Sequence, residues 1–478
     1  MSSLRPWIYA LLLTMLLSAI LLPLEDLLAP GWGAVIGGQQ WTQWSLVLLY
    51  LVLVIAAAWL VSIIYHRLLQ GTGAWTRLLR LTAGWFSMTG LSPLQPALAT
   101  VIILALFSAM LVRGMEPAVS PTGLVAATTA FLFCLALGAE IALRKLDEAG
   151  NPLNHFRSVI SEMSTPLAGR LVMMLTSAAM FAALARWQPP IYRLISAPNG
   201  RDLIVQAVGM VAIAFVLSLA LTHSKPQKEE AAPRPASGGS VRLAWVLVVC
   251  ALLLPLLGTL ISADPLRQSL NLRLTEAEGL LGSWGTDVLG RDLRARLFSA
   301  WWNTNLHAVL SAIVALVIAL PLHAARCRGC GICTSLTTVV DRVPPPVLFL
   351  AGWGMTWGLT GPNFTTVAAG VGVALFPTAL RLLVHRRHAL ATMAVLALSG
   401  MLLILGWELA LGMVGFVAPP DPSFGTIVGD ARGVLGAAPW LIAYSAGLFI
   451  FAAVLGVSAL HAVTKAYGLP RSTTLLRG

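Results

Sequence analysis

The chain has 478 residues, of which 58% are hydrophobic and only 10% are charged. A soluble domain does not need so much apolar side chain, whereas a helix crosses a bilayer with about 20 apolar residues. The composition therefore excludes a soluble enzyme or soluble binding module and predicts a polytopic membrane protein. The apolar runs are continuous rather than alternating, so we expect helices and not a closed β-barrel.

The net charge of +12 does not indicate nucleic-acid binding, because membrane proteins collect Lys and Arg in their cytoplasmic loops. With the N-terminus and Arg5 placed inside, most basic loops fall on the cytoplasmic side, and both termini are predicted to be cytoplasmic. The first span runs into Glu25 and Asp26 without a small-residue cleavage site, so we expect it to be retained. Five cysteines, with Cys134 and Cys250 inside spans, argue against a disulfide framework.

The apolar runs predict an all-α polytopic membrane protein with about twelve transmembrane helices in two six-helix halves. Residues 1–222 form the first half, and residues 241–478 form the second. Residues 223–240 between them are rich in Pro, Gly, Ser and charge, which is the composition of a flexible cytoplasmic linker. The expected spans are about 6–23, 44–64, 95–112, 121–143, 168–187 and 202–222, then 242–262, 304–324, 336–357, 365–384, 389–416 and 440–463.

A hydrophilic segment after the first span of the second half carries the densest run of charge. It reads Gly285-Thr286-Asp287-Val288-Leu289-Gly290-Arg291-Asp292, and Arg296 follows four residues later. One interpretation is a solvated loop, since alternating Asp and Arg suit a segment that faces water. The other is a structured element over the mouth of a substrate pathway, in which Gly285 and Gly290 allow tight turns. In that element Asp287, Arg291 and Asp292 would pair to hold the turns.

Cys327, Cys330 and Cys333 have a spacing that can serve zinc or iron–sulfur ligation. A fourth ligand is missing nearby apart from His323, so we favour three thiols in a short cytoplasmic turn, or a site of lipid or redox modification, and expect no metal or other cofactor. Glu408 is a carboxylate within a predicted span. Such residues are costly in a membrane and usually face protein or a water-filled path.

The last motif is Pro419-Pro420-Asp421-Pro422-Ser423-Phe424-Gly425, which precedes the final span. Together with Gly-Thr-Asp-x-x-Gly-Arg-Asp at 285–292, it resembles the signature of the second permease subunit of dipeptide, oligopeptide and nickel ABC importers. The first half lacks a sharp signature, although residues 65–88 are similar to a cytoplasmic loop of the first permease subunit. The chain thus resembles a fusion of the two permease subunits with a degenerate first half.

This resemblance implies a permease without enzymatic activity of its own, in a bacterial inner membrane. The chain has no Gly-x-x-x-x-Gly-Lys-Ser/Thr phosphate loop, so ATP hydrolysis would belong to separate ABC ATPase subunits. An extracytoplasmic binding protein would deliver the substrate, and peptides are favoured over nickel chelates. Residues 154–163 of the loop 144–166 predict a short amphipathic helix for the ATPase contact, with Phe156, Arg157 and Glu162 as candidates.

The second half departs from the family where relatives carry an ATPase-docking helix between the fourth and fifth spans. Here the basic run His385-Arg386-Arg387-His388 is followed at once by the apolar run that begins at Ala389. The coupling helix is therefore predicted to be missing from this half. This departure keeps a second hypothesis open, in which the chain is a degenerate permease that serves as a non-transporting scaffold or regulatory subunit of a membrane complex.

Overall fold

The computed structural model describes residues 94–114, 238–279, 282–328, 363–384, 389–414 and 422–469, together with five residues between 348 and 356. Regular structure in these ranges is helical, apart from an isolated antiparallel bridge between Thr286 and Asp292. The helices are α5 (Leu94–Val112), α11 (Gly238–Leu260), η1 (Leu270–Leu272), α12 (Leu293–Cys327), α15 (Phe364–Val384), α16 (Ala389–Val414), α17 (Phe424–Arg432) and α18 (Pro439–Ala466).

Within the described ranges, five helices are long and apolar enough to cross a membrane, namely α11, α12, α15, α16 and α18. They coincide with five of the six spans predicted for the second half. Of the sixth, at 336–357, the structure describes only five residues, all helical. In the first half α5 coincides with the span predicted at 95–112. The other five spans of that half lie outside the described residues, so the count of twelve and the division into halves stay predictions.

Two boundaries differ from the sequence prediction. Helix α11 begins at Gly238, so the last three residues of the predicted linker 223–240 are helical. Helix α12 begins at Leu293, eleven residues before the predicted start at 304. At about 1.5 Å per residue its 35 residues extend about 52 Å, well beyond a hydrocarbon core of about 30 Å. The charged first turns of α12 therefore have room to lie at the edge of the membrane.

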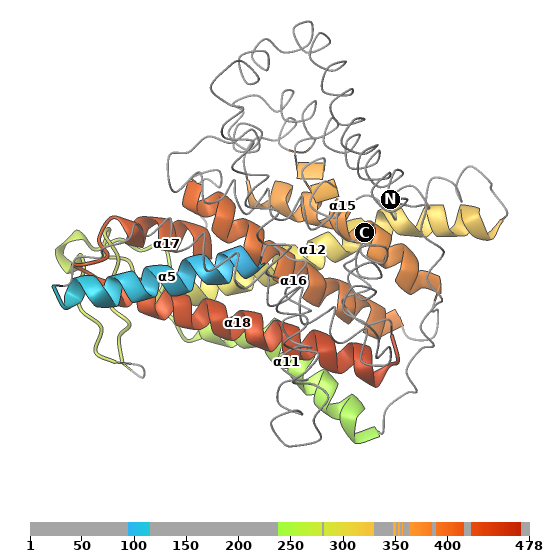
Figure 1. Ribbon diagram of the computed structural model, residues 1–478, viewed down its shortest axis with the longest axis horizontal. Helices are drawn as coiled ribbons and strands as arrows, with labels where there is room; N and C mark the ends of the chain where they lie inside the picture. The colour runs from blue at the N-terminus through green and yellow to red at the C-terminus, as the bar shows by residue number, and fades with distance from the viewer. Residues whose placement is uncertain are drawn as a thin grey trace, which may run out of the picture.

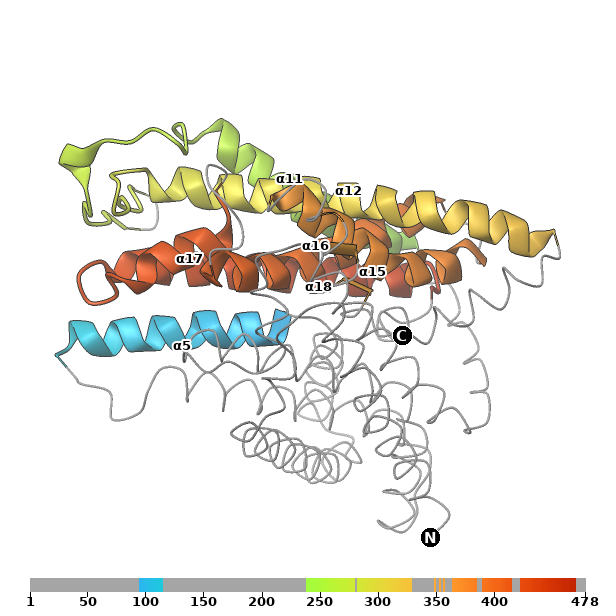
Figure 2. The same cartoon turned by 90° about the horizontal axis from the view of Figure 1, so that it is seen from above.

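The helices lie roughly side by side in layers (Figure 1). Helices α11 and α12 lie on one side of the layer that holds α16, α17 and α18, and α5 lies on the other side (Figure 2). Helix α12 packs along α15 and α16, whereas α5 packs against α16 and α18. The second predicted half thus forms the body of the described bundle, and α5 from the first half packs directly onto it.

Helix α12 shows two faces with different side chains. Its buried face is made mostly of small residues, including Ala300, Thr304, Ala308, Ser311, Ala312, Ala315 and Ala319. Its exposed apolar residues are large and aliphatic, namely Leu306, Val309, Leu310, Ile313, Val317 and Leu320. Helices in membranes approach closely through small residues, so this pattern assigns the first face to neighbouring helices and the second to lipid.

A buried amide compensates for a proline in α11. Pro255 has no N–H, so the carbonyl of Ala251, four residues earlier, loses its usual helical donor. The side chain of Asn305 on α12 donates to that carbonyl at 3.0 Å and to the carbonyl of Leu252 at 2.9 Å. A polar residue inside the bundle therefore joins α11 to α12 by satisfying backbone that the proline leaves open.

Candidate functional site

The first motif forms a tight loop at one end of the bundle. Gly285 and Gly290 both have positive φ, at 79° and 71°. The backbone N–H of Asp287 donates to the carbonyl of Arg291 at 3.0 Å, and that of Gly290 donates to the carbonyl of Asp287 at 3.0 Å. A Cβ at Gly290 would lie 1.9 Å from the carbonyl oxygen of Ser269. This glycine is therefore required both by its backbone conformation and by its close approach to the preceding loop.

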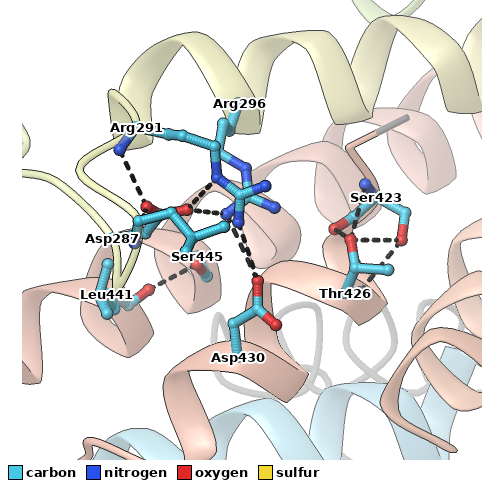
Figure 3. A network of polar contacts seen from close by, with 9 residues as sticks. Asp287, Arg291, Arg296, Ser423, Thr426, Asp430, Leu441 and Ser445 are labelled. Atoms are coloured by element: carbon cyan, nitrogen blue, oxygen red, sulfur yellow. Dashed lines mark hydrogen bonds and ion pairs between the residues drawn. The ribbon is translucent and has the colours of Figure 1, made fainter. Parts of the chain in front are cut away.

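Asp287 is the central acceptor of this loop and is almost fully buried. Its Oδ1 accepts from the backbone N–H groups of Leu289 and Arg291, each at 2.9 Å. Its Oδ2 accepts from Arg291 Nε at 2.7 Å and from the guanidinium of Arg296 (Figure 3). Four donors on one carboxylate satisfy a buried charge that would otherwise be costly.

The next acidic residue begins the long helix. Asp292 is the N-cap of α12, and its Oδ1 accepts from the backbone N–H of Ala295 at 2.8 Å. Because the cap lies directly after the loop, Arg296 falls in the first turn of α12 and points back at Asp287. The segment is thus structured, with the predicted turns at the two glycines and the predicted pairing of Asp287 with Arg291, whereas Asp292 caps α12 instead of pairing with an arginine. Arg296 belongs to the helix and not to the loop.

Both arginines also reach a second carboxylate from a distant part of the chain. Arg291 Nη2 lies 3.3 Å from Asp430 Oδ2, and Arg296 Nη1 lies 3.6 Å from the same oxygen. Asp430 belongs to α17, and its side chain is 40% exposed, compared with 4% for Arg296. The network of Asp287, Arg291, Arg296 and Asp430 (Figure 3) holds two positive and two negative charges and joins the first motif to α17.

The second motif positions α17. Ser423 is the N-cap, and its hydroxyl accepts from the backbone N–H of Thr426 at 3.1 Å. The Thr426 hydroxyl in turn accepts from the backbone N–H of Ser423 at 3.1 Å, which completes a capping box. Pro422 is buried beside Ser423, and its carbonyl lies 3.5 Å from Asn303 Nδ2 of α12. Pro419 and Pro420 lie outside the described residues.

Close packing holds the start of α17 against α16. A Cβ at Gly425 would lie 2.2 Å from the carbonyl oxygen of Glu408 and 2.8 Å from the Cα of Gly412. Only glycine allows the two helices to approach this closely. Gly425 therefore sets the position of α17 along α16, and with it the position of Asp430.

Glu408 lies buried between helices, as expected for a carboxylate inside a membrane. Thr304 of α12 donates from its hydroxyl to Glu408 Oε2 at 2.8 Å. His307 Nδ1 lies 3.9 Å from Glu408 Oε1, and the His307 ring stacks on Phe364 of α15 with centroids 5.6 Å apart. These contacts connect α12, α15 and α16 in the interior of the bundle.

The predicted cysteine cluster and the predicted ATPase contacts lie mostly outside the described residues. Cys327 ends α12, and its Sγ lies 3.7 Å from His323 Nε2, one helical turn earlier. Cys330 and Cys333 lie outside the described residues, as do the predicted ATPase contacts Phe156, Arg157 and Glu162. Among the side chains that the structure describes, no group of three His, Cys, Asp or Glu residues converges on a possible metal site.

The predicted absence of a docking loop in the second half can be compared with the helix bounds. Helix α15 ends at Val384 and α16 begins at Ala389, so four residues connect them. Such a connection is within the usual range between packed helices and leaves no room for an additional helix.

Sequence reasoning missed three residues of the polar clusters, namely Asp430, Thr304 and His307. Asp430 was not proposed because it lies 139 positions from Arg291 and follows no motif residue directly. Its one signal was Ser423 with Thr426, which predicts a helix start, and Asp430 lies two turns further along that helix. Thr304 lies at the start of a predicted apolar span, and the sequence gives no sign of its partner.

A comparison with protein-family models and with curated proteins finds no match to this chain.

Proposed function

We propose that the chain is a permease component of an ABC transporter of the peptide and nickel importer type. It forms the substrate pathway, separate ATPase subunits power it, and an extracytoplasmic binding protein supplies the substrate. The observation that supports this proposal is the contact between the two signature segments. Arg291 and Arg296 pair with Asp430 on the helix that Ser423 caps.

This contact matters because transport by alternating access requires groups of helices to move as units around the pathway. The ion-pair network fixes the loop 285–292 over the ends of α12 and α17. The Gly425 contact then fixes α17 on α16, and Glu408 with Thr304 fixes α16 on α12. These contacts connect the helices of the second half from its polar end to its interior. The second half could therefore move as one rigid unit against the other half.

A tagged chain purified from bacterial membranes in mild detergent, with its partners identified by mass spectrometry, tests the proposal. We expect ABC ATPase subunits and, after reconstitution with ATP, uptake of short peptides into proteoliposomes. Alanine at Phe156, Arg157 and Glu162 together removes the predicted contact, so the ATPase is lost while the elution profile of the chain stays unchanged. Glu276→Ala, in the exposed loop after η1, is the matched control and keeps the ATPase.

One observation favours a second candidate, a non-transporting scaffold derived from a permease. The four-residue connection between α15 and α16 leaves the second half without the loop that docks an ATPase in importers. Other membrane proteins that co-purify in place of ATPases would favour the scaffold. Membrane partners without any ATPase would contradict the importer proposal.

A further inference from the structure

The exposed apolar face of α11 continues past the end of the helix into the following loop. Leu260 is 72% exposed and Ile261 is 76% exposed, directly after Leu253 and Leu257 on the same face. Leu266, Leu270 and Leu272 follow in the loop, and all three are exposed. Large aliphatic side chains rarely gather on a surface that faces only water, so this loop requires an apolar neighbour.

The side of the bundle on which this loop lies favours lipid as that neighbour. Helices α11 and α12 lie on the side of the bundle opposite α5 (Figure 2). The exposed apolar residues of α11 are Leu243, Val246, Val249, Leu253, Leu257 and Leu260, without a Gly, Ala or Ser among them. Helix partners in a membrane usually meet through small residues, so this stripe is suited to acyl chains.

Length and charge place the loop at the membrane boundary. The 23 residues of α11 extend about 34 Å, slightly more than the hydrocarbon core, so Ile261 emerges near the headgroups. Arg267 and Arg273 are exposed among the leucines, and long basic side chains reach lipid phosphates from such positions. The acidic residues flank this stretch, with Asp264 near its start and Glu276 and Glu278 after its end.

Hydrogen bonds also connect this loop to the first motif, residues 285–292. The Thr286 hydroxyl donates to the carbonyl of Leu272, and its oxygen accepts from the backbone N–H of Thr275 at 2.9 Å. The backbone N–H of Thr286 donates to the carbonyl of Thr275 at 3.1 Å. With Gly290 packed on Ser269, the leucine-bearing loop and the charged loop form one unit.

We propose that residues 261–274 are an interfacial anchor that lies in the headgroup region of the bilayer. Leu270 and Leu272 contact the upper acyl chains, and Arg267 and Arg273 approach lipid phosphates. Because the loop is bonded to Thr286, the anchor fixes the depth of the loop 285–292 relative to the membrane. This inference depends on the membrane-embedded helices and not on the proposed transport function.

Photo-crosslinking of the full chain in native membranes tests the anchor. A benzophenone amino acid replaces Leu270, with Leu253 of α11 as the lipid-facing control and Glu276 as the water-facing control. After irradiation, mass spectrometry of the peptides is expected to find phospholipid adducts at 253 and 270 and none at 276. An adduct of site 270 with another protein, its failure to react with lipid while 253 reacts, or equal lipid adducts at 276 would each overturn the proposal.

A second measurement separates anchoring from chance proximity to lipid. The benzophenone is moved to position 266, in a chain that also carries Leu270→Asp and Leu272→Asp. Both substituted side chains are exposed, so the bundle is expected to fold and the lipid adduct at 253 to persist. The adduct at 266 should be lost, because two carboxylates keep the loop out of the apolar zone. Its persistence at the level of the unsubstituted loop would contradict the anchor.

Discussion

The two motif segments meet at the same end of the bundle, but different forces hold them. The first is built around a buried charge, since Asp287 accepts four hydrogen bonds and pairs with Arg291 and Arg296. The second is built from small residues and a helix cap, with Gly425 packed on α16 and Ser423 capping α17. Asp430 is the point at which the charged segment contacts the packed one.

This difference predicts how much stability a substitution in each segment costs. Removal of one partner from a buried ion pair leaves the other charge unpaired in an apolar place, which costs more than the pair itself contributes. An enlarged packing residue costs less, because neighbouring helices relax partly around it. A lost cap or a single hydrogen bond costs least. Substitutions along this series therefore test whether charge or packing dominates.

Asp287→Ala has the largest expected effect. It leaves Arg296 buried without its main partner, and the loop loses the acceptor of its two backbone N–H bonds. We expect the free energy of unfolding to fall by about 3–5 kcal/mol. Denaturant unfolding in detergent, followed by tryptophan fluorescence, measures this change.

A double variant is the control for this result. Asp287→Leu with Arg296→Leu removes both buried charges and leaves Arg291 to pair with Asp430, so it should be more stable than Asp287→Ala. If the double variant is equally unstable, the backbone bonds of Asp287 matter more than its charge. If Asp287→Ala leaves the unfolding curve unchanged, the charged network does not hold this end of the bundle.

Gly425→Ala tests the packed segment. The new Cβ would meet the carbonyl oxygen of Glu408, and a backbone atom in the middle of a helix cannot simply turn away. We expect a loss of about 1–3 kcal/mol in the free energy of unfolding, measured in the same assay. Gly447→Ala in α18 is the matched control, because nothing lies within 4 Å of its added Cβ. Equal effects at both positions would show that helix propensity, and not the crossing of α16 and α17, decides the result.

The sequence predicted the long helices well, because a continuous apolar run of about 20 residues crosses a bilayer only as an α-helix. Helices α15 and α16 begin within one residue of the predicted starts at 365 and 389. The start of α12 was missed by eleven residues, because Arg294 and Arg296 lower the local hydropathy. The structure places those residues in a helix since Asp292 caps it and Asp287 neutralises Arg296, and neither effect can be read from hydropathy alone.

The sequence motifs predicted much of the candidate site, but they did not predict the contact of the two arginines with Asp430. The turns at Gly285 and Gly290 and the pairing of Asp287 with Arg291 could be inferred, since they lie within a few residues of each other. The contact with Asp430 depends on how α17 crosses α16, which a single apolar pattern does not specify. Helix α17 itself has nine residues, too short to register as a span, so its capping box was its one local signal.

Ser423→Ala tests the cap of that helix. The hydroxyl that accepts from the backbone N–H of Thr426 is lost, so we expect the free energy of unfolding to fall by about 1 kcal/mol. Ser423→Thr is the control, since threonine keeps the capping hydroxyl without adding a charge at this buried position. Hydrogen exchange of the amides in 424–432 should increase with Ala and stay nearly unchanged with Thr. Unchanged exchange in both variants would show that Gly425 alone fixes α17.

Thr304→Val is expected to have the smallest effect and tests the contact farthest from the charged end. Valine keeps the shape of threonine but cannot donate to Glu408 Oε2, so the measured change reports one interior hydrogen bond. Such bonds between membrane helices average about 0.6 kcal/mol, which is the loss we expect in the unfolding assay. Thr304→Ser keeps the hydroxyl and loses one methyl, so any further loss there reports packing. A loss in Thr304→Val as large as that of Asp287→Ala would reverse the order of the two regions, because the interior carboxylate would then hold the bundle more strongly than the charged network at its end.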